Sequence, residues 1–345
     1  MEPDDIKDDL EIRKARRASA ASPVSSSTLR RDGSKAMNMD VLRGLGSLPA
    51  ELGPTAVTVG FFDGVHRGHQ AVFARTASVA KALGLVPVAV TFDRHPREIL
   101  TPGREPPLLT TLERKATLIA KTGMAALVIL EFTEEFSRWP PEEFIRRVLS
   151  EGLEAQHAVI GANFTFGYKA RGNLALLMDR GPEHGFEVEG VSLMELDGRV
   201  VSSSSIRGAL AAGDLAWPER ALGRRYVLDG RVVKGAGRGA GLGFPTANLE
   251  TWPRLLLPGD GVYAGKAFVG DRGFVAAINV GSNPTFGEEP LHVEAFLIDF
   301  DDDLVGEEIA VEFWARLRDE ERFDSAEELA RQIGEDVQRT KELVR

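Results

Sequence analysis

The chain has 345 residues, of which 43% are hydrophobic and 27% charged, a balance typical of a folded globular protein with room for two domains. It contains no cysteine, which excludes disulfides, thiolate catalysis and cysteine-ligated metals. Its formal net charge of −10 disfavours non-specific nucleic-acid binding, and we expect no nucleic-acid partner. Local arginines and lysines can still hold a small anionic substrate.

The sequence shows no membrane or export signal. It has no run of 18 apolar residues, and no signal-peptide pattern opens it. We therefore expect a cytoplasmic protein without a membrane partner. Residues 1–38 combine an acidic run, a basic run and serine-rich sequence, too polar to bury a core, so we expect a disordered tail with Met37 or Met39 as an alternative start.

Residues 39–216 alternate between strand and helix patterns. We expect strands at 57–59, 86–92, 126–130, 158–160 and 188–191, and helices at 71–83, 112–122, 141–150 and 174–180. This alternation predicts an α/β domain with a doubly wound, Rossmann-like parallel sheet. No Gly-x-Gly-x-x-Gly follows a strand and no Walker A motif is present, so a dinucleotide fingerprint and a P-loop are both absent from the sequence.

The pattern changes where Trp217-Pro218 interrupts it, and residues 217–345 form the second expected domain. Glycine-rich turns there separate expected strands at 226–233, 261–268, 274–280, 292–300 and 309–314. Such spacing predicts an antiparallel barrel or sandwich. A final helix is expected from about residue 326, with a capping box at Ser325.

One stretch of the first domain, residues 56–70, has the layout of a phosphate site. A β-branched run ends at Gly60, a turn with Asp63 follows, and His66 and His69 stand where a helix begins. Ligands of open α/β sheets bind beyond the carboxyl ends of strands, and a helix N-terminus attracts anions. Two imidazoles there could bind a phosphate that gains charge during a reaction. The alternatives are an ordinary surface turn, or a metal site that would need a third ligand.

Three further loops are expected near the same sheet edge. Residues 91–96 contain a histidine followed by proline, and residues 161–167 place Asn163 between two aromatics. Residues 201–207 bring serines and Arg207 to the start of a short helix, where hydroxyls, helix N–H groups and the guanidinium could clamp a triphosphate. Taken singly, the simpler alternatives are a proline-ended loop, core aromatics and a helix N-cap.

The second domain has its own candidate site. Glycine stands at every other position from 235 to 243, so the backbone can approach phosphates closely, although a flap without ligand contacts is the simpler alternative. Thr246 and Asn248 follow and offer oxygen ligands for magnesium. Strand alternation puts Glu294 on one face with His292, where a carboxylate is either a barrel-end residue or a catalytic base.

The first domain contains, in order, Gly-x-Phe-Asp-Gly-Val-His-x-Gly-His, Thr-Phe-x-x-His-Pro, Gly-x-Asn-Phe-x-Phe-Gly and Ser-Ser-x-x-Ile-Arg. The His-x-Gly-His pattern resembles the nucleotidyltransferase superfamily, and the four pieces together resemble the adenylyltransferase half of prokaryotic bifunctional riboflavin kinase/FAD synthetases. The resemblance implies that His66 and His69 contact ATP and stabilise charge at the α-phosphorus. It also implies flavin contacts through His95, Pro96 and Asn163, and ATP or phosphate contacts through Gly60, Phe62, Asp63, Gly68, Ser203, Ser204 and Arg207.

The second domain contains Gly-Phe-Pro-Thr-Ala-Asn after its glycines, then Asn-Val-Gly-x-x-Pro-Thr-Phe, a Val-Glu strand and Leu-Arg-Asp-Glu-x-Arg-Phe. These pieces resemble riboflavin kinases, which implies a six-stranded antiparallel barrel with a terminal helix. The implied roles are Mg-ATP binding by Thr246 and Asn248, proton abstraction by Glu294 and a flavin contact by Arg318. Gly241 and Gly243 would lie against ATP. The departures from the family pattern are Phe61, Asn163 and Ser204, and none of them removes a needed chemical group.

Both resemblances, which together cover about residues 39–340, predict a bifunctional enzyme. It would phosphorylate riboflavin with ATP to give FMN, then adenylylate FMN with ATP to give FAD and pyrophosphate. The expected partners are riboflavin, FMN, FAD and ATP, the expected ion is Mg²⁺, and we expect a monomer or weak homo-oligomer. The rivals are a cytidylyl- or pantetheine-phosphate-type nucleotidyltransferase with an unrelated barrel, and a non-enzymatic flavin- or nucleotide-binding protein in which one site has decayed.

Overall fold

The computed structural model describes residues 39–235, 237–281 and 292–344. They belong to one compact unit, Met37–Arg345. The predicted tail, residues 1–38, lies outside the described residues, as do residues 282–286 of the motif that begins at Asn279.

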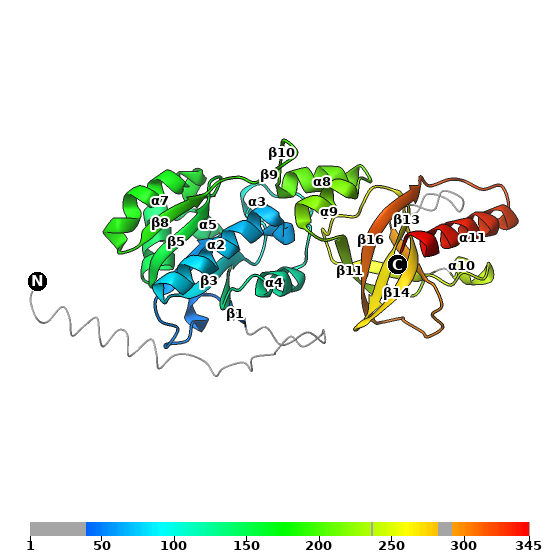
Figure 1. Ribbon diagram of the computed structural model, residues 1–345, viewed down its shortest axis with the longest axis horizontal. Helices are drawn as coiled ribbons and strands as arrows, with labels where there is room; N and C mark the ends of the chain where they lie inside the picture. Colours follow the sequence, from blue (N-terminus) through cyan, green and yellow to red (C-terminus); the bar gives the residue numbers. More distant parts are fainter. Residues whose placement is uncertain (1–38, 236, 282–291, 345) are drawn as a thin grey trace, which may run out of the picture. The chain divides into compact units, whose positions relative to one another are not determined.

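The first half contains a six-stranded parallel sheet (Figure 1). Its strands, in spatial order, are β1 (Asp40–Arg43), β4 (Ala126–Leu130), β3 (Val86–Phe92), β2 (Thr55–Val59), β5 (Ala155–Gly161) and β8 (Glu187–Val191). The predicted parallel α/β sheet is confirmed. Strands β2 and β4 are buried at every position, as expected of a sheet covered on both faces. Edge strand β1 was not predicted because it is short and mostly exposed.

The predicted helices are present with shifted ends. They are α2 (Arg67–Leu83), α4 (Leu112–Ala120), α6 (Pro141–Phe144), which continues as a π-type turn over Ile145–Ser150, and α7 (Leu174–Arg180). Helix α2 begins four residues earlier than predicted because the imidazole of His66 caps it, accepting from the backbone N–H of His69. Imidazole is not among the favoured caps, so the sequence did not reveal this start.

Shorter elements complete this half. They are α3 (Arg97–Leu100), α5 (Glu134–Ser137), β6 (Thr165–Phe166), β7 (Gly172–Asn173), β9 (Glu195–Leu196), β10 (Arg199–Val200), α8 (Ser203–Ala211) and α9 (Ala216–Leu222).

The chain runs from β2 to β3 and β4 on one side, then returns to β5 on the other. Ligands of open α/β sheets bind at such a switch point, so the loops after β2 and β5 hold the favoured position.

The second half is a closed antiparallel barrel, which settles the choice between barrel and sandwich. Its strands, in spatial order, are β11 (Tyr226–Val233), β12 (Ala247–Thr251), β15 (His292–Leu297), β14 (Arg272–Gly281), β13 (Gly261–Val269) and β16 (Glu308–Arg318). Strand β12 was not predicted because it is short and follows the glycine run, part of which forms the single turn α10 (Arg238–Gly241).

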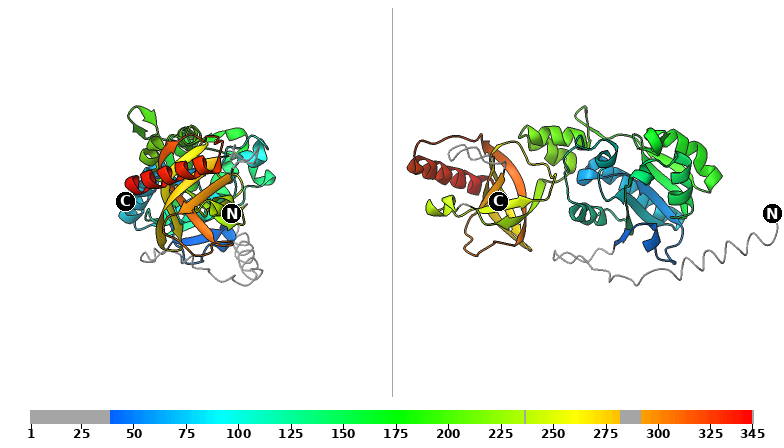
Figure 2. Two further views of the ribbon diagram at one scale, coloured as in Figure 1. Left: turned by 90° about the vertical axis from the view of Figure 1, so that its right-hand side faces the viewer. Right: turned by 180° about the vertical axis from the view of Figure 1, so that it is seen from behind.

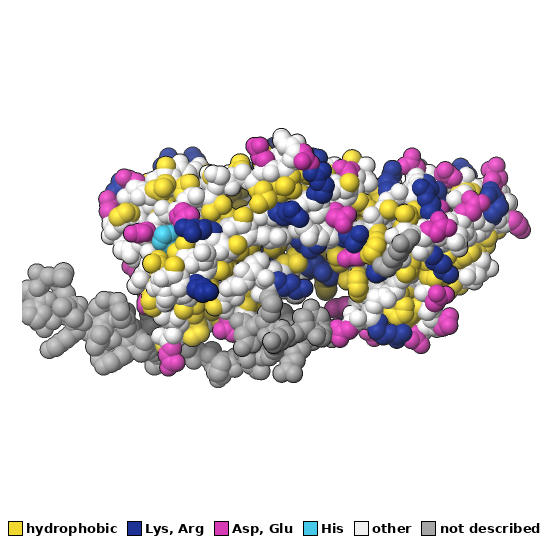
Figure 3. Space-filling model, in the orientation of Figure 1, with side chains coloured by type: hydrophobic (Ala, Val, Ile, Leu, Met, Phe, Trp, Pro, Cys, Tyr) yellow, Lys and Arg dark blue, Asp and Glu magenta, His cyan; other side chains and the backbone are white. Residues whose placement is uncertain are grey.

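The predicted terminal helix is α11 (Ala326–Leu343), which packs against β13, β14 and β16 (Figure 2). Its N-cap is Ser325, whose hydroxyl accepts from the backbone N–H of Glu328 at 3.2 Å. On the face in Figure 3, basic and acidic side chains are interspersed. No helix among the described residues has the length and apolarity that a membrane span requires.

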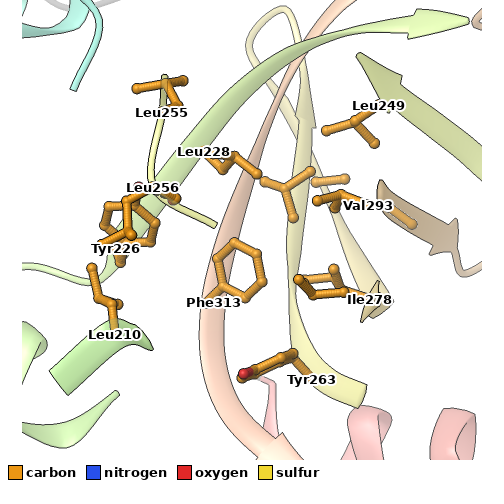
Figure 4. Packing of buried hydrophobic residues seen from close by; sticks show 14 of the residues in the cluster. Leu210, Tyr226, Leu228, Leu249, Leu255, Leu256, Tyr263, Ile278, Val293 and Phe313 are labelled. Atoms are coloured by element: carbon orange, nitrogen blue, oxygen red, sulfur yellow. Dashed lines mark hydrogen bonds between the residues drawn. The ribbon is translucent and has the colours of Figure 1, made fainter. Parts of the chain in front are cut away.

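The barrel is filled by large apolar side chains, among them Phe313, Tyr263 and Ile278 (Figure 4). The same cluster continues into Leu210 of α8 and Leu222 of α9. Helices α8 and α9 therefore share a core with the barrel, although both precede its first strand.

We predict that Gly265→Ala destabilises the barrel. A Cβ at this β13 position would lie 2.6 Å from Ile278 Cδ1 and would also collide with the carbonyl oxygen of Glu312 in β16. Backbone cannot yield as a flexible side chain can, so we expect a loss of about 1–3 kcal/mol, measured as a lower thermal midpoint.

Gly334→Ala in α11 is the matched control. A Cβ there meets nothing within 4 Å, and alanine favours the helix by about 1 kcal/mol. The control should raise the midpoint, and a Gly265→Ala protein as stable as wild type would contradict the close packing of β13 on β16.

Candidate active sites

The turn between β2 and α2 has a strained backbone. Phe62 and Val65 adopt φ angles of 53° and 43° in the left-handed region, where a β-branched residue is an outlier. Gly60 and Gly64 are required here, because an added Cβ would lie 2.7 Å from the Phe62 ring or the Leu109 side chain, respectively. Such a conformation persists only when its surroundings hold it.

The buried carboxylate of Asp63 supplies much of that hold. It accepts hydrogen bonds from the backbone N–H groups of Leu109 at 2.9 Å and Thr110 at 3.3 Å. It also forms an ion pair with Arg207 Nη2 at 2.6 Å, and Arg207 Nε donates to the carbonyl of Pro107 at 2.7 Å. Asp63 and Arg207, both predicted to contact ATP, thus bind each other and hold the loop after β2, residues 107–110 and α8 together. Phosphate binding by either residue stays a prediction.

The backbone carbonyls of the turn are fastened as well. The hydroxyl of Ser203 donates to the carbonyl oxygen of Asp63 at 3.0 Å. Arg224 donates to the oxygen of Gly64 at 2.7 Å. The structure thus brings the loop after β2 together with the start of α8. Ser204 lies exposed beside Ser203, with its hydroxyl available to a ligand.

The two predicted histidines form a stacked pair at the N-terminus of α2. Their ring centroids are 3.6 Å apart, and Nδ1 of His66 accepts from the backbone N–H of His69 at 3.3 Å. Nδ1 of His69 is buried without a hydrogen-bond partner among the described residues. A buried polar atom left in this way is uncommon in a folded protein and calls for an explanation. Gly68 keeps the pair uncrowded, since a Cβ there would stand 3.1 Å from the His66 ring.

Both imidazoles are held neutral. Burial lowers the pKa of His66 to about 4, and the nearby charges of Arg224 and Arg207 act in the same direction. Burial lowers the pKa of His69 well below its usual range, and His66 and Lys115 add to this. At neutral pH each ring therefore carries one N–H that can donate to a phosphate oxygen.

The loop after β3 meets this turn. The ring of His95 lies edge-on to that of Phe61, with centroids 4.8 Å apart. Burial lowers the pKa of His95 to about 4, and Arg207 adds to the shift. Pro96 follows as the N-cap of α3. Asn163 lies two residues after the end of β5 and just before Phe164. It is exposed, so its amide is accessible.

Lys115 of α4 was missed in the sequence analysis. It is 3% exposed, and its Nζ lies 3.9 Å from the centre of the Phe61 ring. Burial lowers its pKa to about 8, and Asp63 opposes the shift. A sequence signal existed: Lys115 falls three residues after Leu112 and four before Ile119, a spacing that puts all three on one face of a helix.

The predicted kinase residues come together in the barrel. Asn248 of β12 and Asn279 of β14 both pair in register with Glu294 of β15. The hydroxyl of Thr246 donates to Glu294 Oε2 at 3.1 Å, and His292 Nε2 lies 3.3 Å from Oε1. Antiparallel pairing thus brings the hydroxyl of Thr246 and the amide of Asn248 to the carboxylate of Glu294, which stands far from both in the sequence.

The glycine run borders this cluster. Gly235 packs so closely on Asn248 that a Cβ would collide with its amide. A Cβ on Gly241 or Gly243 would meet nothing within 4 Å, and Gly243 has φ +86°. The backbone at these two glycines is therefore open to a ligand, as the predicted ATP contact requires.

Arg318 has a partner that the sequence did not predict. Its guanidinium binds the carboxylate of Asp336 in α11, with Nη2 at 2.8 Å and Nε at 3.0 Å from Oδ2. This pair fastens the terminal helix to the end of β16. A flavin contact by Arg318 stays a prediction.

Mg²⁺ fits the donors of the barrel cluster. The ion prefers oxygen ligands and keeps several waters and substrate phosphates, so the hydroxyl of Thr246 and the side-chain oxygen of Asn248 are suitable. Within the described residues there is no group of three or more His, Asp or Glu arranged to hold a metal by themselves.

Fold and sites together define a two-part ATP-dependent transferase, with a nucleotidyltransferase-type sheet domain followed by a kinase barrel. The family model described as FAD synthetase matches residues 48–205, and the one described as riboflavin kinase matches residues 222–344. The chain belongs to the family of bifunctional riboflavin kinases/FMN adenylyltransferases.

Several relatives with this family name are similar to this chain over nearly their whole length. The protein of Pseudomonas fluorescens is 38% identical over 87% of this chain and 96% of its own, and that of Bacillus subtilis is 37% identical over 84% and 92%. A crystal structure described as a macrolide-efflux protein from Streptococcus pneumoniae is 28% identical, with a TM-score of 0.79 over 88% of this chain and 99% of that one.

We predict that Lys115→Met stabilises the protein at pH 7. The folded-state pKa is about 8 and the ordinary value 10.5, so below pH 8 the charged amine carries its full burial cost. Removing the amine should raise the free energy of unfolding by about 1–3 kcal/mol, after subtraction of the lost contact with Phe61. The gain should be measured as a higher urea midpoint. As pH rises from 8 to 10.5 the folded amine loses its proton first, so wild type gains stability and the difference should shrink.

Lys121→Met, at the exposed end of α4, is the control and should change little. A Lys115→Met protein less stable than wild type at both pH 7 and pH 9.5 would show that the amine is a net stabilising group.

Proposed function

We propose that the chain makes FAD from riboflavin in two steps, with residues 39–216 carrying FMN adenylylation and residues 217–345 carrying riboflavin phosphorylation. The observation behind this proposal is that one chain holds both the neutral His66–His69 pair at a sheet switch point and the Thr246–Glu294 contact in a barrel. A cysteine-free composition favours the cytoplasm, and we expect a monomer or weak homo-oligomer.

In the adenylylation step, a phosphate oxygen of FMN attacks the α-phosphorus of ATP. A new P–O bond forms, the bond to the leaving pyrophosphate breaks, and no covalent enzyme intermediate is needed. The N–H groups of His66 and His69 would donate to ATP phosphates and stabilise the charge that develops there. Ser204, Ser203 and Arg207 would lie along the triphosphate, beside the backbone of Gly60, Phe62, Asp63 and Gly68. His95, Pro96 and Asn163 would hold the flavin.

In the phosphorylation step, Glu294 would accept the proton of the riboflavin 5′-hydroxyl. The resulting oxygen attacks the γ-phosphorus of ATP, and ADP leaves. Thr246 and Asn248 would hold the Mg²⁺ that neutralises phosphate charge when it is bound with ATP. Gly241 and Gly243 would let the backbone approach the phosphates, and Arg318 would contact the flavin. The existing hydrogen bond from Thr246 keeps the carboxylate oriented.

Incubation of purified protein with riboflavin, ATP and Mg²⁺ tests the function. Chromatography should resolve FMN that appears first and FAD that follows, with pyrophosphate released in step with FAD. Protein that makes neither flavin would refute the proposal. FMN alone would restrict the activity to the barrel.

Two variants should separate the halves. Glu294→Gln removes the base, so riboflavin should no longer become FMN while supplied FMN still becomes FAD. His69→Ala removes a phosphate donor, so FMN should accumulate and FAD formation should fall by about 10²–10³-fold.

Glu250→Gln is the control for the first variant, since Glu250 is an exposed carboxylate on β12, the strand that pairs with β15. It should leave both steps intact. Loss of both steps in Glu294→Gln would contradict two independent sites, and an unchanged rate of FAD formation in His69→Ala would remove His69 from the mechanism.

A further inference from the structure

The segment that joins α9 to β11 is hydrogen-bonded to the strained turn before α2. Arg224 donates to the carbonyl oxygens of Gly64 at 2.7 Å and Val65 at 3.4 Å. From the opposite direction, Nε2 of Gln70 in α2 bridges the oxygens of Val65 and Leu222, at 2.9 Å to each. Arg224 of the joining segment and Gln70 of α2 thus link the turn to the end of α9 and the residues that follow it.

These hydrogen bonds act on a part of the backbone that is strained. Phe62 and Val65 hold left-handed conformations that cost about 1–3 kcal/mol each, so the turn would relax without outside partners. The residue after Val65 is His66, whose ring caps α2 and stacks on His69. The direction of the carbonyls before it therefore governs where the histidine pair stands.

We propose that Arg224 is a positioning residue for adenylyl transfer, even though it lies among the residues matched by the riboflavin kinase family model. It would act through the carbonyls of Gly64 and Val65, without touching substrate. This inference rests on the proposed function of the His66–His69 pair. It also means that the functional adenylyltransferase unit extends past residue 216, the boundary expected from the sequence.

The charge of Arg224 adds a second effect on the same pair. After burial, Arg224 is the largest cause that lowers the pKa of His66, ahead of Arg207. Lys115 acts on the other ring and lowers the pKa of His69, while Arg207, which also acts on His66, is paired with the carboxylate of Asp63. Arg224 itself stays charged at neutral pH, because burial and Arg114 lower its pKa only to about 10.

The test compares Arg224→Met with Arg225→Met in the full chain. Loss of the guanidinium should lower kcat for conversion of supplied FMN to FAD by about 10- to 100-fold, as expected when catalytic groups are displaced by roughly 1 Å. Riboflavin phosphorylation should be unchanged, because its residues lie in the barrel. Arg225 is the matched control: its guanidinium lies 3.6 Å over the Trp314 ring, and its loss should leave FAD formation unchanged.

A titration separates positioning from general destabilisation. With ¹³C-labelled histidine, NMR should show His66 titrating near pH 4 in wild type and closer to its ordinary value of 6.5 in Arg224→Met. Arg224→Lys keeps the charge but cannot reproduce the guanidinium's two hydrogen bonds to the turn. It should keep the low His66 titration and still form FAD slowly.

The outcomes distinguish this inference from the function on which it rests. Wild type that makes FMN but no FAD would overturn the adenylyltransferase assignment and this role together. Wild type that makes FAD, with Arg224→Met equally fast and His66 titrating as before, would overturn only the role of Arg224. Equal loss of both activities with a lower melting temperature would also overturn it, since that is a purely structural effect.

Discussion

The first domain depends on one buried carboxylate, that of Asp63. A charge taken out of water must be matched by hydrogen bonds and an opposite charge. The backbone N–H groups of Leu109 and Thr110 and the guanidinium of Arg207 supply both. These partners come from segments far apart in the chain, so satisfying Asp63 draws the loop after β2, the approach to α4 and the start of α8 together. The position of His66 and His69 follows from that assembly.

The two sites are built by different physical means. In the barrel, antiparallel pairing sets Asn248 opposite Glu294 and brings Thr246 within hydrogen-bond reach, so the strand register itself fixes the site. In the sheet domain, the histidines stand after a strained turn that side chains from remote segments hold. The barrel site therefore depends only on residues of the barrel itself. The sheet-domain site depends on packing across the chain, and it places cationic side chains around two neutral imidazoles.

Much of the fold was predictable because hydrophobic periodicity is a local property. The bounds of β3, β4, β11 and α7 agree with those expected from the sequence, and the candidate loops after β2, β3 and β5 follow predicted strands. Among the strands of the parallel sheet and the barrel, the exceptions are β1 and β12, which are short and have too few apolar residues for a period to show. Their places come from hydrogen bonding to neighbouring strands, which a single segment does not encode.

The sequence by itself determined the two-domain plan, the family and the chemical groups at each site, because residue types and spacing within a motif are written in consecutive positions. Only the tertiary structure decided how charged groups pair. Arg207 binds Asp63, Arg318 binds Asp336, and Lys115 is buried against Phe61. The physical reason is that an ionic group takes whichever partner packing brings within a few ångströms, and packing joins residues that are not neighbours in the sequence.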